Sequence, residues 1–329
     1  MVASRNSLST DLLTRVGAFL APRLRPDEPL WAGLSGGCDS VVLLHLLSRL
    51  GLGNVSAIHV HHGLSPNADA WAEFNVTYCE RLGIPLTIRH VTVDLSSGMG
   101  MEAAARAARY AAFAECSAGC LVLAQHRGDQ AETVLFNLLR GTGVTGAAGM
   151  PVERRFGHLR LLRPLLDVSR AEIESYASAH GLAWINDESN ADTKLTRNFL
   201  RHEALTAISQ RFPAAEASLA QAAGHFAEAA GLLDELAADD WQQVAEGEMA
   251  LVAGLRQLSL PRLKNLLRHR LRSLGWQVPV ATRLDEFARQ LRSAAPDRHP
   301  ELVLPDGKMR VARGRLHWLS EKLRMAASI

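Results

Sequence analysis

The sequence has few cysteines and no long apolar run. Four cysteines in 329 residues are too few for a disulfide framework, so we expect free thiols and a cytoplasmic protein. No apolar stretch reaches the roughly 20 residues needed to cross a membrane. Residues 1–26 carry Asp11, Arg15 and Arg23 within a helical apolar pattern, which indicates a helix and not a signal peptide. An apolar fraction of 47% favours folded domains over disorder.

Charge is nearly balanced overall but unevenly distributed. The formal net charge is +2, yet residues 212–255 contain no Lys or Arg and residues 261–272 contain no acid. The basic residues of the second stretch are Arg262, Lys264, Arg268, Arg270 and Arg272. Two interpretations stay open: a face that binds nucleic acid, or cations neutralised by acids such as Asp234 and Asp240 on neighbouring helices.

Short apolar runs alternate with amphipathic stretches over the first 180 residues. Strands are predicted over 30–34, 54–61, 85–93, 120–124 and 159–162, and helices over 41–50, 70–82, 100–118, 130–139 and 169–180. This order predicts an α/β fold with a doubly wound parallel sheet. A long helical region and a hairpin over 302–311 follow, so we expect a first domain over 1–210 and a mainly helical second domain over 211–329.

A glycine-rich turn lies between the first predicted strand and its helix, with the sequence Ser35-Gly36-Gly37-Cys38-Asp39-Ser40. It lacks the Gly-Lys-Ser/Thr of a Walker loop. Glycines let the backbone approach a ligand closely, and the first helical turn offers unpaired N–H groups at its positive end. The turn suits a phosphate, although an ordinary capped turn is the alternative. The string resembles the pyrophosphate loop of the N-type ATP pyrophosphatases, which cleave ATP to AMP and pyrophosphate.

Three polar segments follow the ends of predicted parallel strands. They are Ser35–Ser40, His59–Gly63 and His126–Asp129. In doubly wound sheets, ligands bind beyond the carboxyl ends of the strands. We therefore expect these segments to lie along one edge of the sheet.

Further strings, in order over residues 30–201, resemble one family, the tRNA(Ile)-lysidine synthetases. They are His59–Leu64, Glu102 with Arg106, Arg109 and Tyr110, Ala124–His126 with Asp129, Gln130, Glu132 and Thr133, Arg140–Gly143 with Gly146, Arg163–Leu166, Trp184 with Asp187, Ser189 and Asn190, and Arg197 with Asn198 and Arg201. Residues 211–329 resemble the helical substrate-binding domain of the family more loosely. Long members carry a further C-terminal domain, before which this chain is expected to stop.

The resemblance implies an adenine nucleotide alpha hydrolase-like fold and a reaction in two steps. ATP adenylates the C2 oxygen of the wobble cytidine in the CAU anticodon of tRNA(Ile). Free lysine then attacks C2 through its amine, AMP leaves, and lysidine results. ATP and Mg²⁺ are the implied cofactors, because the departing pyrophosphate builds negative charge that needs N–H donors and a cation.

The resemblance also assigns residues to this chemistry. The catalytic set is Asp39, Arg106 and Asp129, and Asp39 and Asp129 are also the expected metal ligands. The expected ATP-binding residues are Ser35, Gly36, Gly37, Cys38, Asp39, Ser40, His59 and His126. The expected substrate and tRNA residues are Arg109, Glu132, Arg140, Asp187, Asn190, Arg197 and Arg201. Each Asp also has a purely structural interpretation as a helix cap.

Two positions depart from the family pattern. Gly128 stands where the family usually places a second Asp or Asn, and Ser65 stands where Arg is common. Two rival functions also stay open: a tRNA thiolase, for which we find no paired Cys-x-x-Cys motif, and a nucleotide-binding module without catalysis. The expected partners are the tRNA and free lysine, with no membrane and with a homodimer as one possible assembly.

Overall fold

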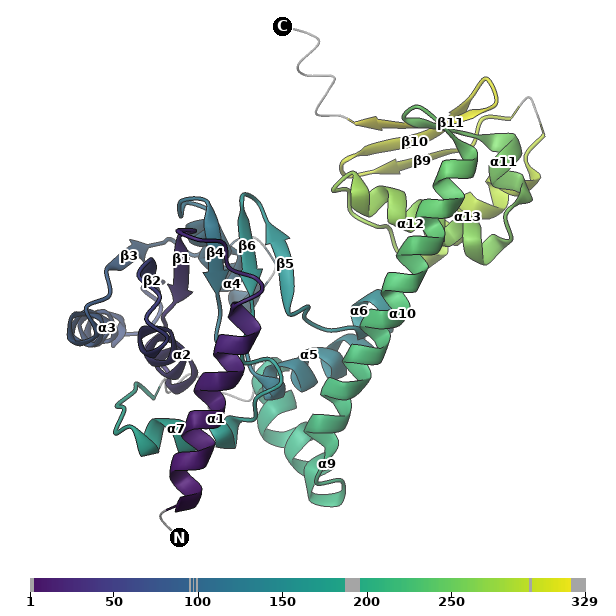
Figure 1. Ribbon diagram of the computed structural model, residues 1–329. Helices are drawn as coiled ribbons and strands as arrows, with labels where there is room; N and C mark the ends of the chain where they lie inside the picture. Colours follow the sequence, from purple (N-terminus) through teal and green to yellow (C-terminus); the bar gives the residue numbers. More distant parts are fainter. Residues whose placement is uncertain are drawn as a thin grey trace, which may run out of the picture. The chain divides into compact units, whose positions relative to one another are not determined.

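The structure is a computed structural model that describes residues 3–94, 96, 98, 100–186, 196–295 and 298–320. The chain divides into two compact units, residues 1–227 and residues 228–329, which are described separately (Figure 1). No helix among the described residues is long and apolar enough to cross a membrane.

The first unit is built on a six-stranded sheet with the order β3-β2-β1-β4-β6-β5. The strands are β1 (Leu30–Gly33), β2 (Val55–His61), β3 (Leu86–His90), β4 (Gly119–Val122), β5 (Glu153–Phe156) and β6 (Leu159–Leu162). All neighbours pair in parallel except β5, which forms an antiparallel hairpin with β6. The predicted doubly wound fold is therefore confirmed, while the edge strand β5 was not predicted.

Helices cover both faces of this sheet. The helices packed on the sheet are α1 (Ala3–Leu20), α2 (Cys38–Arg49), α3 (Ala68–Leu82), α4 (Met101–Phe113) and α7 (Arg170–Ala179). Two further helices, α5 (Arg127–Leu139) and α6 (Val144–Ala147), follow β4 in the chain and pack against each other. Successive residues of β4 belong to two different hydrophobic cores. Cys120 and Val122 pack in the core that contains α1, α2 and α7, whereas Leu121 packs in the core that contains α4. This period-two alternation is what a sheet buried on both faces requires.

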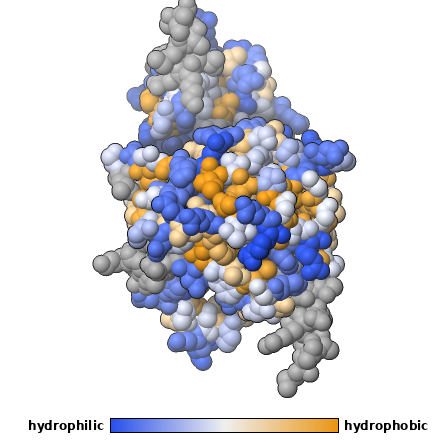
Figure 2. All heavy atoms as spheres, turned by 90° about the vertical axis from the view of Figure 1, so that its left-hand side faces the viewer, coloured by the Kyte–Doolittle hydropathy of each residue, from blue (hydrophilic) through white to orange (hydrophobic). Residues whose placement is uncertain are grey.

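The edge of the sheet at β3 is less covered than its centre. Residues of β3 are half-buried or exposed, in contrast to the fully buried β4. Figure 2 shows the side of the molecule that carries α3 and β3, where hydrophobic residues gather among hydrophilic ones. The first unit continues through α8 (Thr196–Phe199), the π-helical turn η3 (Leu200–Ala204), α9 (Leu205–Arg211) and the start of α10 (Ala215–Val244).

The second unit combines helices with an antiparallel sheet. After α10 come β7 (Ala245–Glu246), β8 (Met249–Leu251), α11 (Val252–Gln257), α12 (Leu260–Ser273), α13 (Ala281–Ser293), β9 (Glu301–Leu304), β10 (Gly307–Ala312) and β11 (Arg315–Ser320). The strand order is β7-β8-β11-β10-β9. The predicted hairpin is confirmed as β9–β10, but it belongs to a five-stranded sheet that the helical pattern of this region did not indicate.

The basic residues of α12 are mostly paired with acids of the same unit. The pairs are Arg262 with Asp240, Lys264 with Asp285 (3.0 Å), Arg270 with Glu248, and Arg272 with Asp234. The Asp240 side chain is fully buried. The geometry therefore favours the interpretation that these cations neutralise neighbouring acids, over the interpretation that they form a nucleic acid–binding face.

Candidate functional site

The Ser40 side chain holds the loop between β1 and α2 in shape through hydrogen bonds to the loop backbone. The Ser40 hydroxyl accepts hydrogen bonds from the backbone N–H groups of Ser35 and Gly36, each at 3.2 Å, and donates to the Gly37 carbonyl at 2.9 Å. The Ser35 hydroxyl accepts from the Gly37 N–H at 3.3 Å. Both serines therefore hold the shape of the loop, which leaves its backbone pre-formed before any ligand arrives.

Gly36 is the one residue of this loop that requires glycine for its backbone. Its φ is +90°, in the region that disfavours residues with a Cβ. A Cβ built there would lie 2.5 Å from Cδ1 of Ile185, whose N–H donates to the Gly36 carbonyl at 2.9 Å. The chain at Ile185 thus packs directly on the loop.

The start of α2 remains open to a ligand. Gly37 occupies the N-cap position with extended backbone and contributes no side-chain cap. The N–H groups of the first turn, beginning with Cys38, are thus available at the positive end of the helix. The Cys38 side chain itself is buried, and burial raises the pKa of its thiol to about 11. Cys38 can therefore serve a ligand only through its backbone.

His59 lies beneath the loop and not at its surface. Its side chain is buried, with Nδ1 2.9 Å from the Leu34 carbonyl oxygen and 3.0 Å from the Asn75 amide nitrogen. Burial lowers the pKa of the His59 imidazole, which favours the neutral ring. The structure thus places His59 as a support for the end of β1.

Asp39, in the first turn of α2, is held by an arginine that the motif analysis did not single out. Nη1 of Arg170, the first residue of α7, lies 2.6 Å from both carboxylate oxygens of Asp39. Nε2 of His126 is 4.0 Å from the same carboxylate. Burial raises the pKa of Asp39, and the nearby His126 and Arg170 offset only part of that rise.

His126 and Asp129 cap the start of α5 reciprocally. The Asp129 carboxylate accepts from the His126 N–H at 3.0 Å, and Nδ1 of His126 accepts from the Gly128 N–H at 3.0 Å. Because Nδ1 accepts that bond, Nε2 is the ring nitrogen that can donate, and it lies 4.0 and 3.7 Å from the carboxylates of Asp39 and Asp129. His126 therefore joins the two carboxylates that the sequence singled out.

Gly128 allows this position of the His126 ring. A Cβ at residue 128 would lie 2.8 Å from Cε1 of His126. Glycine at position 128, where the family usually has Asp or Asn, thus leaves room for the His126 ring.

Arg197 of α8 and Arg201 of η3 complete the cluster. Arg201 contacts Asp129 at 2.7 Å and Glu132 at 2.9 Å, while Arg197 lies 3.0 Å from Glu102 and 3.6 Å from Glu132. The Glu132 side chain is only 3% exposed, and burial raises its pKa although Arg201 and Arg197 oppose the rise. These ion pairs therefore link five side chains of alternating charge, in the order Glu102, Arg197, Glu132, Arg201 and Asp129.

Three further predicted residues, Arg106, Arg109 and Arg140, lie on α4 or directly after α5. Arg106 donates to the Tyr110 hydroxyl at 3.2 Å, and Arg109 is exposed on the same helix. Arg140 follows α5, with its guanidinium 5.1 Å from the ring centre of Phe136. Asp187 and Asn190 lie outside the residues that the structure describes.

Two of the cluster's carboxylates have the chemistry of a magnesium site. Mg²⁺ prefers oxygen ligands and commonly takes one or two carboxylates together with substrate phosphates. Asp39 and Asp129 supply such oxygens beside the open start of α2. Among the described residues, no group of three or more His, Cys, Asp or Glu is arranged to hold a metal ion by itself. The donor set therefore fits a cation that arrives with phosphate oxygens.

The structure adds residues that the sequence motifs did not reveal. Arg170 and Ile185 contact the loop region from distant parts of the chain, and Asn75 supports His59. One signal was available: Ser169 and Glu172 have capping-box spacing, and both capping bonds form. That signal places the start of α7, but not the direction of Arg170.

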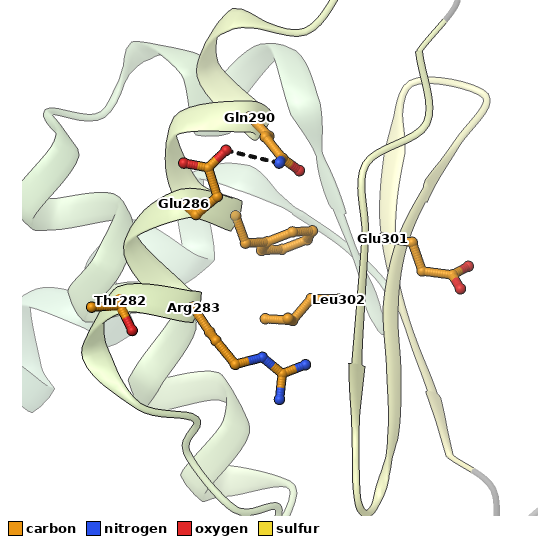
Figure 3. Close-up of a pocket in the computed structure, with 7 residues that line it drawn as sticks. Thr282, Arg283, Glu286, Gln290, Glu301 and Leu302 are labelled. Atoms are coloured by element: carbon orange, nitrogen blue, oxygen red, sulfur yellow. Dashed lines mark hydrogen bonds between the residues drawn. The ribbon is translucent and has the colours of Figure 1, made fainter.

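The second unit contains a cavity of about 320 Å³ between α13 and β9. Phe287 of α13 and Leu302 of β9 are among its lining residues, and Figure 3 shows the Leu302 side chain pointing toward α13. The Arg283 guanidinium donates to the Val303 carbonyl at 2.8 Å, and Glu286 accepts from Gln290 at 2.9 Å. Because these polar groups are satisfied by their neighbours, this cavity is not our candidate site.

Comparison with protein families gives two matches. A PP-loop domain matches residues 8–208, and a TilS substrate binding domain matches residues 251–317. The tRNA(Ile)-lysidine synthase of Nitrosomonas europaea is 41% identical over 325 residues, covering 97% of this chain and 71% of that protein. The chain belongs to the tRNA(Ile)-lysidine synthase family. The predicted family membership is thereby confirmed.

Other members of the family give the same result. The tRNA(Ile)-lysidine synthases of Pseudomonas fluorescens and Pseudomonas syringae are each 44% identical, covering 95% and 97% of this chain and 73% and 74% of their own lengths. Among solved structures, a U34-tRNA thiolase from Methanococcus maripaludis is similar, with a TM-score of 0.54 and 19% identity over 68% of this chain and 80% of that chain. This last likeness shows the fold alone, and the family matches do not favour the thiolase alternative.

Proposed function

We propose that this protein ligates free lysine to C2 of the wobble cytidine in the CAU anticodon of tRNA(Ile). The C2 oxygen attacks the α-phosphorus of ATP and pyrophosphate leaves, which gives adenylated tRNA. The amine of lysine then attacks C2, and AMP departs with the original oxygen. Adenylation is needed because the C2 oxygen is a poor leaving group until it is part of AMP.

The observation that carries this proposal is the pre-formed loop beside paired carboxylates. The open N–H groups at the start of α2 suit the charge that develops on departing pyrophosphate. Asp39 and Asp129 lie next to them, each within 4.0 Å of the His126 ring nitrogen. A family member with this arrangement has the parts needed for ATP cleavage to AMP and pyrophosphate.

We propose further that Asp39 and Asp129 hold Mg²⁺, which when bound neutralises phosphate charge. Arg170 and Arg201 now compensate these two carboxylates at 2.6 and 2.7 Å. A cation that enters would take over that compensation, so both guanidinium groups would become free to contact phosphate oxygens. Arg106 stays our candidate for contact with the ATP phosphates or the adenylated base.

Substrate recognition is proposed for the two units separately. In the first unit, Glu132, Arg197 and Arg201 belong to the same cluster as Asp129 and are proposed to contact the substrates. Asp187 and Asn190 are proposed to recognise lysine. Residues 211–329 are proposed to bind the body of the tRNA.

The cytoplasm is the proposed location, because all four cysteines are free thiols and the substrate is a tRNA. A homodimer is the proposed assembly to be tested by sedimentation.

Product analysis tests this function directly. We expect ATP cleavage to AMP and pyrophosphate to require the CAU-anticodon tRNA, and release of AMP from the RNA to require lysine. Mass spectrometry of the digested tRNA should show lysidine. A tRNA whose wobble base is guanosine is the control and should give no product. AMP formation without tRNA, or a sulfur-containing nucleoside as product, would contradict the proposal.

The paired cations of α12 lead to a prediction about the second unit. Replacing Arg262, Lys264, Arg268 and Arg270 together by Ala is expected to lower the melting temperature, because Asp240 would keep a buried carboxylate without its partner. The slope of tRNA affinity against salt should stay close to wild type. Unchanged melting, with a log–log slope reduced by about 0.7–0.9 per lost contact, would show instead that these cations bind phosphate.

A further inference from the structure

A stack of cationic and aromatic side chains joins α4 to the edge strand β5. We call it the Tyr110 stack, and it consists of Arg106, Tyr110, Arg154 and Phe156. The guanidinium carbons of Arg106 and Arg154 lie 4.9 and 5.4 Å from the centre of the Tyr110 ring. The Phe156 ring meets Tyr110 edge-on at 5.2 Å and 79°. Cation–π and ring contacts thus link these four side chains across α4 and β5.

The positive charge of the stack is not cancelled by the nearby acids. Glu102, one turn before Arg106, is 3.0 Å from Arg197, and Glu153, beside Arg154, is 3.2 Å from Arg160. Both carboxylates are therefore committed to other arginines. The charge of the stack is left available for an anionic ligand.

The Tyr110 phenol responds to this charge. Burial alone would raise its pKa, but Arg106, Arg163 and Arg154 lower it below its ordinary value. A positive, aromatic surface of this kind suits single-stranded RNA, whose unpaired bases stack on aromatic rings and arginine planes while its phosphates attract cations.

The Tyr110 stack lies a short distance along α4 from the cluster of carboxylates and arginines that contains Glu102 and Asp129. Glu102, Arg106 and Tyr110 follow one another at intervals of four residues, so they run along neighbouring positions of the helix. At 1.5 Å per residue, Tyr110 is about 12 Å along the helix from Glu102. Glu102 is itself joined to Arg197 of the carboxylate cluster. About three or four stacked nucleotides, at 3.4 Å each, span that length.

We propose that the Tyr110 stack holds an unpaired nucleotide of the anticodon loop close to the cytidine that is modified. The guanidinium plane of Arg154, which is exposed, stacks on the base, and Tyr110 fixes that plane from within. Stacking tolerates any base, so the site contributes affinity and positioning and does not read base identity. This inference rests on the proposed function, since it takes the tRNA as substrate.

Arg155 provides a matched control for Arg154. The two arginines are adjacent in β5 and both are exposed, but successive side chains of a strand point to opposite faces. Arg154→Ala and Arg155→Ala therefore remove the same charge from the same strand, and only the first removes the stack. Arg154→Lys keeps the charge but lacks the planar group that stacks.

The test uses binding of anticodon stem–loop RNAs without ATP or lysine, each with 2-aminopurine at one loop position near the cytidine. We expect quenched emission at one or more positions in the wild type, recovered emission in Arg154→Ala, and quenching kept in Arg155→Ala. Affinity should fall about fivefold to a hundredfold in Arg154→Ala. Arg154→Lys should lose the quenching but keep the salt slope.

Two results would overturn the inference. One is an equal loss of affinity in Arg154→Ala and Arg155→Ala, which would mean that only net charge matters. The other is an absence of quenching at every loop position in the wild type. A wild-type protein that binds and quenches the RNA but forms no lysidine would contradict the proposed function and leave the stack intact, so the two failures are distinguishable.

Discussion

Replacing Asp129 by Asn is expected to lower the rate of lysidine formation by on the order of a hundredfold or more. The amide has no charge with which to hold a cation against the departing pyrophosphate, so the loss falls in the transition state. Asn is the informative substitution because its carbonyl oxygen can still accept the His126 N–H bond that now measures 3.0 Å. The start of α5 should therefore remain capped.

The experiment needs both a rate and an affinity. Single-turnover adenylation gives the rate, and direct binding of tRNA without ATP gives the affinity, which we expect to be nearly unchanged. Asp167→Asn is the matched control, because that carboxylate is 79% exposed and pairs with Arg15 of α1, not with a residue of the cluster. If tRNA affinity of the Asp129 variant fell as far as its rate, Asp129 would instead act structurally through Arg201.

The sequence predicted the frame of the first unit well, because its signals are local. Apolar runs and helix-period patterns located β1, β2, β3, β4 and β6 and helices between them. The strand β5 escaped notice because its burial pattern leaves Arg154 and Arg155 exposed, so it has no continuous apolar run. An edge strand that is held mainly by its neighbour gives a weak pattern of this kind.

The contacts of the site were less predictable because they join distant parts of the chain. Motifs named Asp39 and Asp129, but nothing local indicated that Arg170 would meet the first at 2.6 Å. The same holds for Ile185, whose side chain packs on Gly36 from a segment about 150 residues later. In the second unit, α12 read alone looked like a basic face. The acids that pair with it come from α10, from α13 and from the turn before β8, and composition alone cannot assign such acids to partners.

Replacing Gly37 by Val is expected to abolish adenylation of the tRNA while the first unit stays folded. Gly37 has φ −70° and ψ 159°, which other residues adopt readily. A Cβ there would meet only Ser35 Oγ, at 3.5 Å, which is ordinary contact. The branched side chain would nevertheless stand over the open N–H groups at the start of α2, where a phosphate must approach the backbone.

Two further variants make this prediction specific. Gly36→Ala should unfold or distort the loop, because its φ is +90° and its Cβ would lie 2.5 Å from Ile185. Gly53→Val is the control for bulk alone, since nothing lies within 4 Å of a Cβ at that exposed position. Melting curves should then separate Gly36→Ala from the other two, and ATP-dependent adenylation should separate Gly37→Val from Gly53→Val. Adenylation at the wild-type rate in Gly37→Val would mean that phosphate does not bind at this loop.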